Sequence, residues 1–87
     1  MGNLYLVDQP FGENALALAR EDREALVILV QDGVYLDTGA LNRAQVRVFA
    51  VRQDVQRRAV SLPGYVQIID YGQFADLIVS NKVINFA

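Results

Sequence analysis

The sequence predicts a small α/β domain organised around a mainly parallel sheet of four to five strands. Three observations support this fold class. Short apolar segments of strand length alternate with segments of helical periodicity along the whole chain, which is the order of a parallel sheet with helical crossovers. The run Ala25–Val30 is apolar throughout, as expected for a strand covered on both sides. Each of the first four predicted strands is followed within a few residues by an aspartate, which commonly begins turns and helices.

The first strand and helix follow from the amino-terminal pattern. Asn3–Val7 is a short apolar strand, and Asp8-Gln9-Pro10 ends it. Residues 11–23 predict a helix because apolar residues recur there every three or four positions, at Phe11, Ala15, Leu18 and Ala19. The apolar run 25–30 is then the predicted central strand of the sheet.

The segment after this central strand allows two interpretations. Asp32-Gly33 between apolar runs is a hairpin signal. However, Val34-Tyr35-Leu36 is short and lacks the alternation of a partner strand. We therefore favour a short helix that is capped by Asp32 and ends near Gly39 or Asn42.

The second half of the chain repeats the alternation. Residues 45–51 predict a partly alternating strand with Arg47 facing outward, and residues 52–58 predict one or two helical turns. Pro63-Gly64 forces a turn before the β-branched and aromatic strand at residues 65–69.

The last helix has a clear start signal. Asp70 is a predicted N-cap, and Gln73 completes a capping box for a helix over residues 71–80. This helix is predicted to bury Phe74, Leu77 and Ile78. The segment 83–86 is then a final strand or a packed tail.

Composition bounds the organisation and the partners of the protein. The 87 residues predict a single domain over residues 1–87. Hydrophobic residues make up 53% of the chain, which is more than a small monomer easily covers, so we expect a homo- or hetero-oligomer. The net charge is -2 and no basic patch is evident, so direct nucleic-acid binding is not expected.

The absence of cysteine and histidine excludes several chemistries. Without cysteine, the chain has no disulfide, thiolate metal site, thiol nucleophile or persulfide-carrying group. Without histidine, it lacks the commonest general base and metal ligand. We expect neither a metal nor a cofactor, and no enzyme activity. The amino terminus does not resemble a signal peptide and no membrane segment is evident, so a cytoplasmic protein is expected.

Polar residues at the predicted strand ends are the candidate functional residues. Carboxyl ends of parallel strands meet at one edge of the sheet, and here they carry Asp8, Asp32, Asp54 and Asp70. These carboxylates could form a cation site or an acid–base pair, but helix capping explains them more simply. No glycine-rich phosphate loop is present. The four tyrosines, Tyr5, Tyr35, Tyr65 and Tyr71, are either interface anchors or core residues with a hydroxyl at the rim.

Three segments together resemble the DsrH/TusB family of sulfur-relay subunits. The first, residues 29–34, reads L-V-Q-D-G-V and is similar to that family's strand ending in (E/Q)-D-G-V. The second, residues 46–58, resembles the family's strand followed by an Asp and, four residues later, an Arg. The third, residues 69–77, is similar to the family segment I-D-Y-x-x-F-V-x-L. The resemblance covers most of the chain in order and spacing.

This resemblance implies a fold and a function. Family members adopt a three-layer α/β/α fold of the DsrEFH type and assemble in the cytoplasm with DsrE/DsrF (TusD/TusC)-like subunits. The complex passes persulfide sulfur to a DsrC/TusE-like acceptor, either for 2-thiolation of the tRNA wobble uridine or for sulfur oxidation. Some members stand alone as small homo-oligomers. This chain departs from the family in having no cysteine and in carrying Ala59 where the family has a glycine.

The resulting expectation is a non-catalytic subunit of a sulfur-relay complex that supports persulfide transfer by cysteine-bearing partners. The residues expected at the partner interface lie at the strand ends and are Asp32, Gly33, Tyr35, Asp54, Arg58, Asp70 and Tyr71. The alternative is a free-standing homo-oligomeric module of the same fold that binds a small ligand or a protein.

Overall fold

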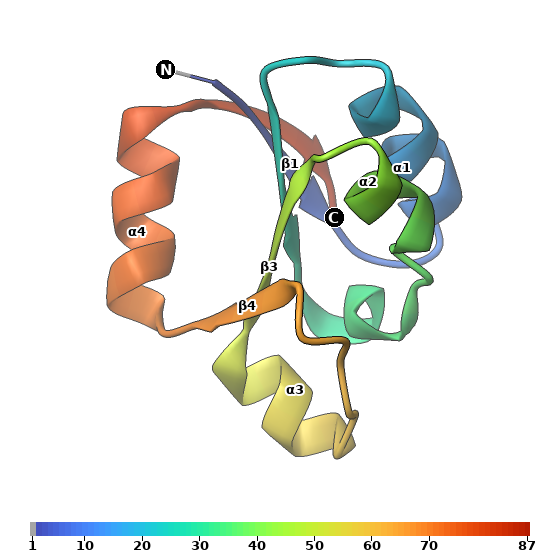
Figure 1. Ribbon diagram of the computed structural model, residues 1–87. Coiled ribbons are helices and arrows are strands. Elements are labelled where there is room, and N and C mark those ends of the chain that lie inside the picture. The colour runs from blue at the N-terminus through green and yellow to red at the C-terminus, as the bar shows by residue number, and fades with distance from the viewer. Residues whose placement is uncertain (1) are drawn as a thin grey trace.

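A computed structural model describes residues 2–87 and contains one five-stranded sheet in the order β4-β3-β2-β1-β5 (Figure 1). All neighbouring strands are parallel, which confirms the predicted α/β class. The segment predicted as a strand or a tail is an edge strand paired with the first strand of the chain. The strands are β1 (Asn3–Val7), β2 (Ala25–Leu29), β3 (Arg47–Val51), β4 (Val66–Ile69) and β5 (Lys82–Phe86).

The helices cover the two faces of the sheet unequally (Figure 1). One face is covered by three helical segments, α1 (Gly12–Arg20), the 3₁₀ helix η1 (Gln31–Tyr35) and α2 (Gly39–Arg43). The other face is covered by α4 (Tyr71–Ser80), whose Phe74 and Leu77 pack against it. The short helix α3 (Arg52–Arg58) follows β3 directly and lies beyond the end of that strand.

The central strand β2 contributes to a hydrophobic core on each face of the sheet. Ala25, Val27 and Leu29 belong to the core under α1, η1 and α2, and Ile28 with Val30 belongs to the core under α4. Successive side chains of a strand point to opposite faces, so a strand in the middle of a covered sheet needs apolar residues at every position. This confirms the interpretation of the unbroken apolar run.

The first helix is shorter than predicted, and its buried stripe agrees with the prediction only in part. The helix begins at Gly12 and ends at Arg20, and the prediction that Phe11 and Leu18 face the core is wrong, because these side chains are 54% and 55% exposed. Ala15 and Ala19 are buried as predicted, and the face that packs on the sheet is completed by Gly12 and the partly buried Leu16. Small side chains allow the helix to lie close to the strands, which leaves the larger ones outside.

The preference for a helix over a hairpin after β2 is confirmed, but the predicted cap at Asp32 and the single continuous helix are wrong. The backbone forms the 3₁₀ helix η1 after Val30, and α2 starts separately after Thr38, with no side-chain cap in either case. Asp32 instead forms an ion pair with Arg58 of α3. A contact made across the fold has therefore replaced the local one expected from the sequence.

The capping box of α4 is present as predicted. The backbone N–H of Gln73 donates to Asp70 Oδ1 at 2.8 Å, and the backbone N–H of Asp70 donates to Gln73 Oε1 at 3.0 Å. The predicted burial of this helix is correct only in part, because Ile78 is 38% exposed. Phe74 and Leu77 lie one turn apart and take the face toward the sheet.

Candidate functional site

The carboxyl ends of the strands meet at one edge of the sheet, on the side where α3 lies in Figure 1. The strand register places Val7 beside Leu29, Leu29 beside Ala50, and Val51 beside Ile69. The residues that follow these strands are therefore at the same level, as the sequence predicted. This edge brings together η1, α3 and the first turn of α4.

The turn after β2 depends on a close approach that only glycine allows. Gly33 is buried, and a Cβ atom at this position would lie 2.3 Å from the carbonyl oxygen of Val7. The same oxygen accepts a hydrogen bond from the Val30 N–H at 3.0 Å. The glycine of the Gln31-Asp32-Gly33 segment therefore lets η1 lie directly on the end of β1.

Gln31 adopts an unusual backbone conformation at the start of η1. Its φ is 49°, in the left-handed region that residues other than glycine seldom adopt. Such conformations persist only where the surrounding structure enforces them, and they are common at functional sites. Here the packing of Gly33 on β1 and the hydrogen bond from Gly33 N–H to the Val30 carbonyl, 2.8 Å long, hold the turn.

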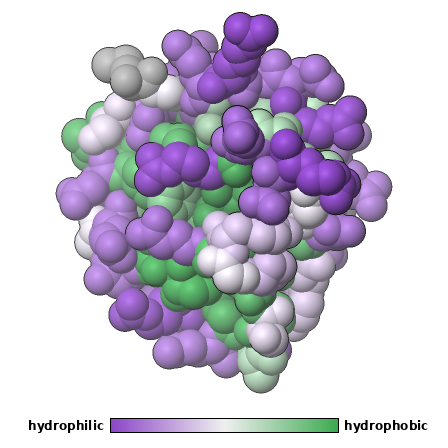
Figure 2. Space-filling view, in the orientation of Figure 1, coloured by the Kyte–Doolittle hydropathy of each residue, from purple (hydrophilic) through white to green (hydrophobic). Residues whose placement is uncertain are grey.

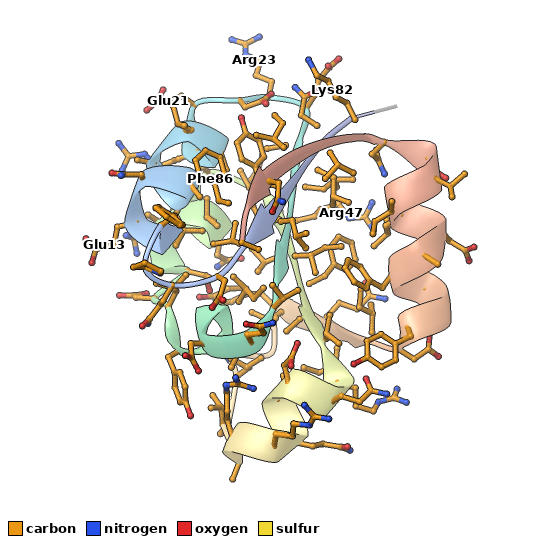
Figure 3. All side chains as sticks on the ribbon, turned by 180° about the vertical axis from the view of Figure 1, so that it is seen from behind. Glu13, Glu21, Arg23, Arg47, Lys82 and Phe86 are labelled. Carbon is orange, nitrogen blue, oxygen red and sulfur yellow. The ribbon has the colours of Figure 1, made fainter. Side chains whose placement is uncertain are left out.

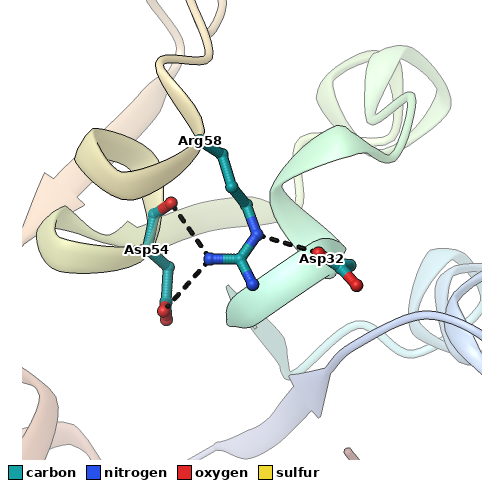
Figure 4. Close-up of polar contacts among 3 residues, drawn as sticks. All are labelled: Asp32, Asp54 and Arg58. Carbon is teal, nitrogen blue, oxygen red and sulfur yellow. Dashed lines mark hydrogen bonds and ion pairs between the residues drawn. The ribbon is translucent and has the colours of Figure 1, made fainter.

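Arg58 links η1 to α3 through two carboxylates (Figure 4). Its Nε donates to Asp32 Oδ1 at 2.8 Å, and its Nη1 lies 3.6 Å from Asp54 Oδ1. The same Nη1 donates to the Asp54 backbone carbonyl at 3.4 Å. The pKa of Arg58 is raised, chiefly because Asp32 accepts this hydrogen bond. None of the residues of α3 is fully buried, so this ion pair supplements limited packing in holding the helix at the edge.

The end of α3 is closed by a Schellman motif at Ala59. Ala59 has φ 49° and ψ 41°, and its N–H donates to the Gln56 carbonyl at 3.2 Å. The Val60 N–H donates back to the Val55 carbonyl at 3.3 Å. The backbone here is thus in the conformation that favours glycine, the residue of the family motif, although the chain carries alanine.

A cleft of about 420 Å³ opens at this edge between α3 and α4. Its floor is apolar and is formed by side chains of the core under α4, namely Leu6, Val30, Val51 and Phe74. Its rim is mostly polar and is formed by Gln31, Asp54, Arg57, Arg58 and Tyr71 together with Ala87. The ion pair and the strained turn are therefore part of the wall of one cleft.

The structure brings together some of the predicted interface residues and separates others. Asp32, Asp54 and Arg58 form one cluster, and Tyr71, 55% exposed, lines the same cleft. Tyr35 ends η1 and is 54% exposed.

The other two predicted residues have local roles. Gly33 is buried and therefore presents no surface to a partner, and Asp70 Oδ1 accepts the hydrogen bond that caps α4. Gln31 and Arg57 were not among the interface residues predicted from the sequence. No local sequence pattern indicates a left-handed backbone at a glutamine or the direction in which a surface arginine points.

The described residues offer neither a cluster of metal ligands nor a membrane-spanning helix. Within residues 2–87, acidic side chains do not gather in a group of three that could hold a metal ion. Helices in the same range are all too short or too polar to cross a membrane. Of the four aspartates at the strand ends, Asp32 and Asp54 pair with Arg58 and Asp70 caps α4. Asp8 has neither role, and its Oδ1 is buried without a hydrogen-bond partner among residues 2–87.

The fold and the carboxyl edge define the class of protein: a parallel α/β/α domain that has a cleft at the carboxyl edge of its sheet and no thiol in its sequence. The chain belongs to the DsrH family, because the sequence profile described as "DsrH like protein" matches residues 10–84. This confirms the family resemblance seen in the three motifs. The family match supports a subunit of the sulfur-relay type.

A solved structure has the same fold over its full length. The crystal structure of the ychN protein from E. coli superposes with a TM-score of 0.80 and 22% sequence identity, covering 99% of each chain. At this identity the likeness establishes the fold alone. A search of curated protein sequences found no significant match.

Proposed function

We propose that this chain is a non-catalytic subunit of a cytoplasmic sulfur-relay complex and packs against cysteine-bearing DsrE/DsrF-like subunits. The observation that carries the proposal is the family match over residues 10–84 in a chain that has no cysteine. A persulfide forms on a thiolate, so this chain cannot hold the sulfur itself. Its contribution to transfer is then to assemble and shape the subunits that do.

The carboxyl edge has the features of a partner surface. Tyr35 and Tyr71 are more than half exposed and offer rigid apolar area with a polar end. Arg58 holds η1 and α3 in fixed positions through Asp32 and Asp54, so little conformational entropy would be lost when a partner binds there. In the proposed complex, sulfur would pass on to a DsrC/TusE-like acceptor, for tRNA wobble-uridine 2-thiolation or for sulfur oxidation.

Co-purification of the tagged full chain from its native cell tests the proposal. We expect cysteine-bearing α/β subunits of similar size to be recovered in fixed stoichiometry. In the same assay, Tyr71→Arg should reduce recovery of the partners, because it places a charge in the proposed contact. Glu24→Arg is the matched control, since it adds the same side chain at an exposed position in the connection between α1 and β2.

Two results would count against the proposal. Recovery of the chain without any cysteine-bearing subunit would remove its main support. Equal recovery of partners with both arginine variants would exclude the carboxyl edge as the contact surface, even if a complex exists.

A free-standing homo-oligomeric binding module is the second candidate. It is favoured by large apolar side chains exposed on the isolated chain, namely Phe11, Leu18, Tyr35, Tyr65, Tyr71, Ile78, Val79 and Val83. On the face shown in Figure 2, hydrophobic residues are exposed at the surface in patches that hydrophilic residues separate. Light scattering of the pure protein separates the candidates: a single stable homo-oligomer without affinity for DsrE/DsrF-like subunits would favour the module.

A further inference from the structure

We propose that the cleft between α3 and α4 binds a small organic anion that has an oxyanion head, a carboxylate or a phosphate, on a compact apolar body. The proposal goes beyond a role in assembly, because it concerns a site within one chain. The volume of about 420 Å³ lies within the roughly 300–1,000 Å³ of small-molecule sites. The cleft also lies at the carboxyl ends of the strands, where open parallel sheets bind their ligands.

The floor of the cleft suits an apolar body. Val30 and Val51 are buried core residues at the ends of adjacent strands, and Leu6 and Phe74 complete the surface from β1 and α4. Their positions are set by the sheet and by the core beneath α4, so the floor exists before any ligand arrives. Covering it would remove apolar area from water.

Arg58 supplies a preorganised donor for an oxyanion. Its Nε and Nη1 are engaged by Asp32 and Asp54, whereas Nη2 makes no hydrogen bond within residues 2–87 (Figure 4). A guanidinium presents its N–H groups in a planar fork that matches a carboxylate or a phosphate. Because two carboxylates already hold this side chain, it loses little rotamer freedom when a ligand binds.

Arg57 supplies the second cation of the site. It lines the cleft and forms no ion pair within residues 2–87. The two arginines are formally balanced by Asp32 and Asp54, so the cleft has no excess charge to attract anions from a distance. Selection must therefore come from short-range donors acting together with the apolar floor, which predicts that an oxyanion without an apolar body binds too weakly to be seen.

Titration of the full-length ¹⁵N-labelled chain by NMR tests the site with four probes. Benzoate and phenyl phosphate carry both the anionic head and the apolar body, benzamide carries the body without charge, and inorganic phosphate is a head alone. We expect benzoate or phenyl phosphate to saturate with a Kd on the order of 1 mM or below and to shift the amides of Gln31, Arg58 and Tyr71. Whichever of the two binds more tightly identifies the preferred head.

A matched pair of arginine variants tests the role of charge. Arg57→Gln should weaken binding of the preferred probe by about tenfold, the loss expected for a charge-assisted hydrogen bond. Arg23→Gln is the control, because Arg23 points into solvent at the end of the molecule opposite α3 (Figure 3). Both positions are exposed, so neither change is expected to unfold the chain.

Several outcomes would overturn the inference. Equal affinity for benzamide and benzoate would exclude recognition of an anion, and saturation by inorganic phosphate would exclude a role for the floor. Unchanged affinity in Arg57→Gln, shifts that map outside the cleft, or no saturable binding of either phenyl probe would each reject the site. The titration uses the chain alone, so its result does not depend on whether partner subunits exist.

Discussion

Replacement of Gly33 by alanine tests whether the close contact between η1 and β1 determines the stability of the carboxyl edge. The added Cβ atom would lie 2.3 Å from the Val7 carbonyl oxygen and 3.1 Å from its carbonyl carbon. The first distance is about 1 Å short of ordinary contact, and the obstacle is backbone rather than a flexible side chain. Either η1 must move away from the sheet or the Val7 carbonyl must turn from its hydrogen bond with Val30.

The expected cost follows from these two responses. Overpacking of a well-packed site costs about 1–3 kcal/mol, and weakening one hydrogen bond adds up to about 1 kcal/mol. The lower entropy of the unfolded alanine chain offsets about 0.4–1 kcal/mol of this. Taken at their midpoints, these terms predict that Gly33→Ala lowers the free energy of unfolding by about 2 kcal/mol and, at about 4–8 °C per kcal/mol, the Tm by roughly 8–16 °C.

Urea unfolding followed by circular dichroism measures the effect, and Gly64→Ala is the matched control. No atom lies within 4 Å of a Cβ atom at Gly64, and its φ is not positive, so the same substitution should leave stability unchanged or raise it slightly. The midpoint for Gly33→Ala should fall with an unchanged slope. Equal midpoints for the two variants would refute the reasoning, because they would show that the backbone at Gly33 relaxes without cost.

Three further predictions concern stability and are measured by the same urea method. Ala59→Gly should stabilise the protein by about 1 kcal/mol, because glycine adopts the left-handed conformation of the Schellman motif without steric penalty; a loss of stability would contradict the assigned motif. Asp70→Ala should destabilise it by about 1 kcal/mol through loss of the capping box of α4, and Asp76→Ala, on the exposed surface of that helix, should have little effect. The pKa of Asp22 is lowered, first by the hydrogen bond from the Asn3 side chain and then by the one from the Glu24 backbone N–H. The ionised Asp22 therefore stabilises the fold above the ordinary aspartate pKa, and this stabilisation is lost as the pH falls through the lower pKa of the folded state. The wild-type protein should therefore lose more stability over that pH range than Asp22→Asn, and parallel pH profiles would show that this carboxylate is not linked to folding.

The features that local sequence patterns predicted correctly depend on short-range rules. Asp70 and Gln73 lie three residues apart and cap their own helix, so the pattern specifies the contact directly. The first helix was predicted less well, because periodicity correctly placed Ala15 and Ala19 in the buried stripe but did not show that Phe11 and Leu18 remain exposed. The choice between two apolar stripes depends on how closely the helix approaches the strands, which is a property of the assembled layers.

The candidate site could be predicted only in part. The sequence placed Asp32, Asp54 and Arg58 at strand ends, which a parallel sheet necessarily gathers at one edge. It assigned Asp32 to a helix cap, whereas in the fold the carboxylate is drawn to Arg58, 26 residues away along the chain. A helix cap and a distant arginine compete for the Asp32 carboxylate, and the residues next to Asp32 in the sequence do not reveal the distant arginine.

By itself, the sequence determined the order of strands and helices, the central place of β2 and the absence of any thiol or imidazole from the chain. These properties depend on side-chain alternation, caps and composition, all of which can be read residue by residue. Only the tertiary structure decided that η1 rests on the end of β1 through Gly33, that Arg58 joins η1 to α3, and that a cleft opens between α3 and α4. Each of these arises where segments distant in sequence meet, and the geometry of such meetings is set by the packing of the whole sheet and its helices.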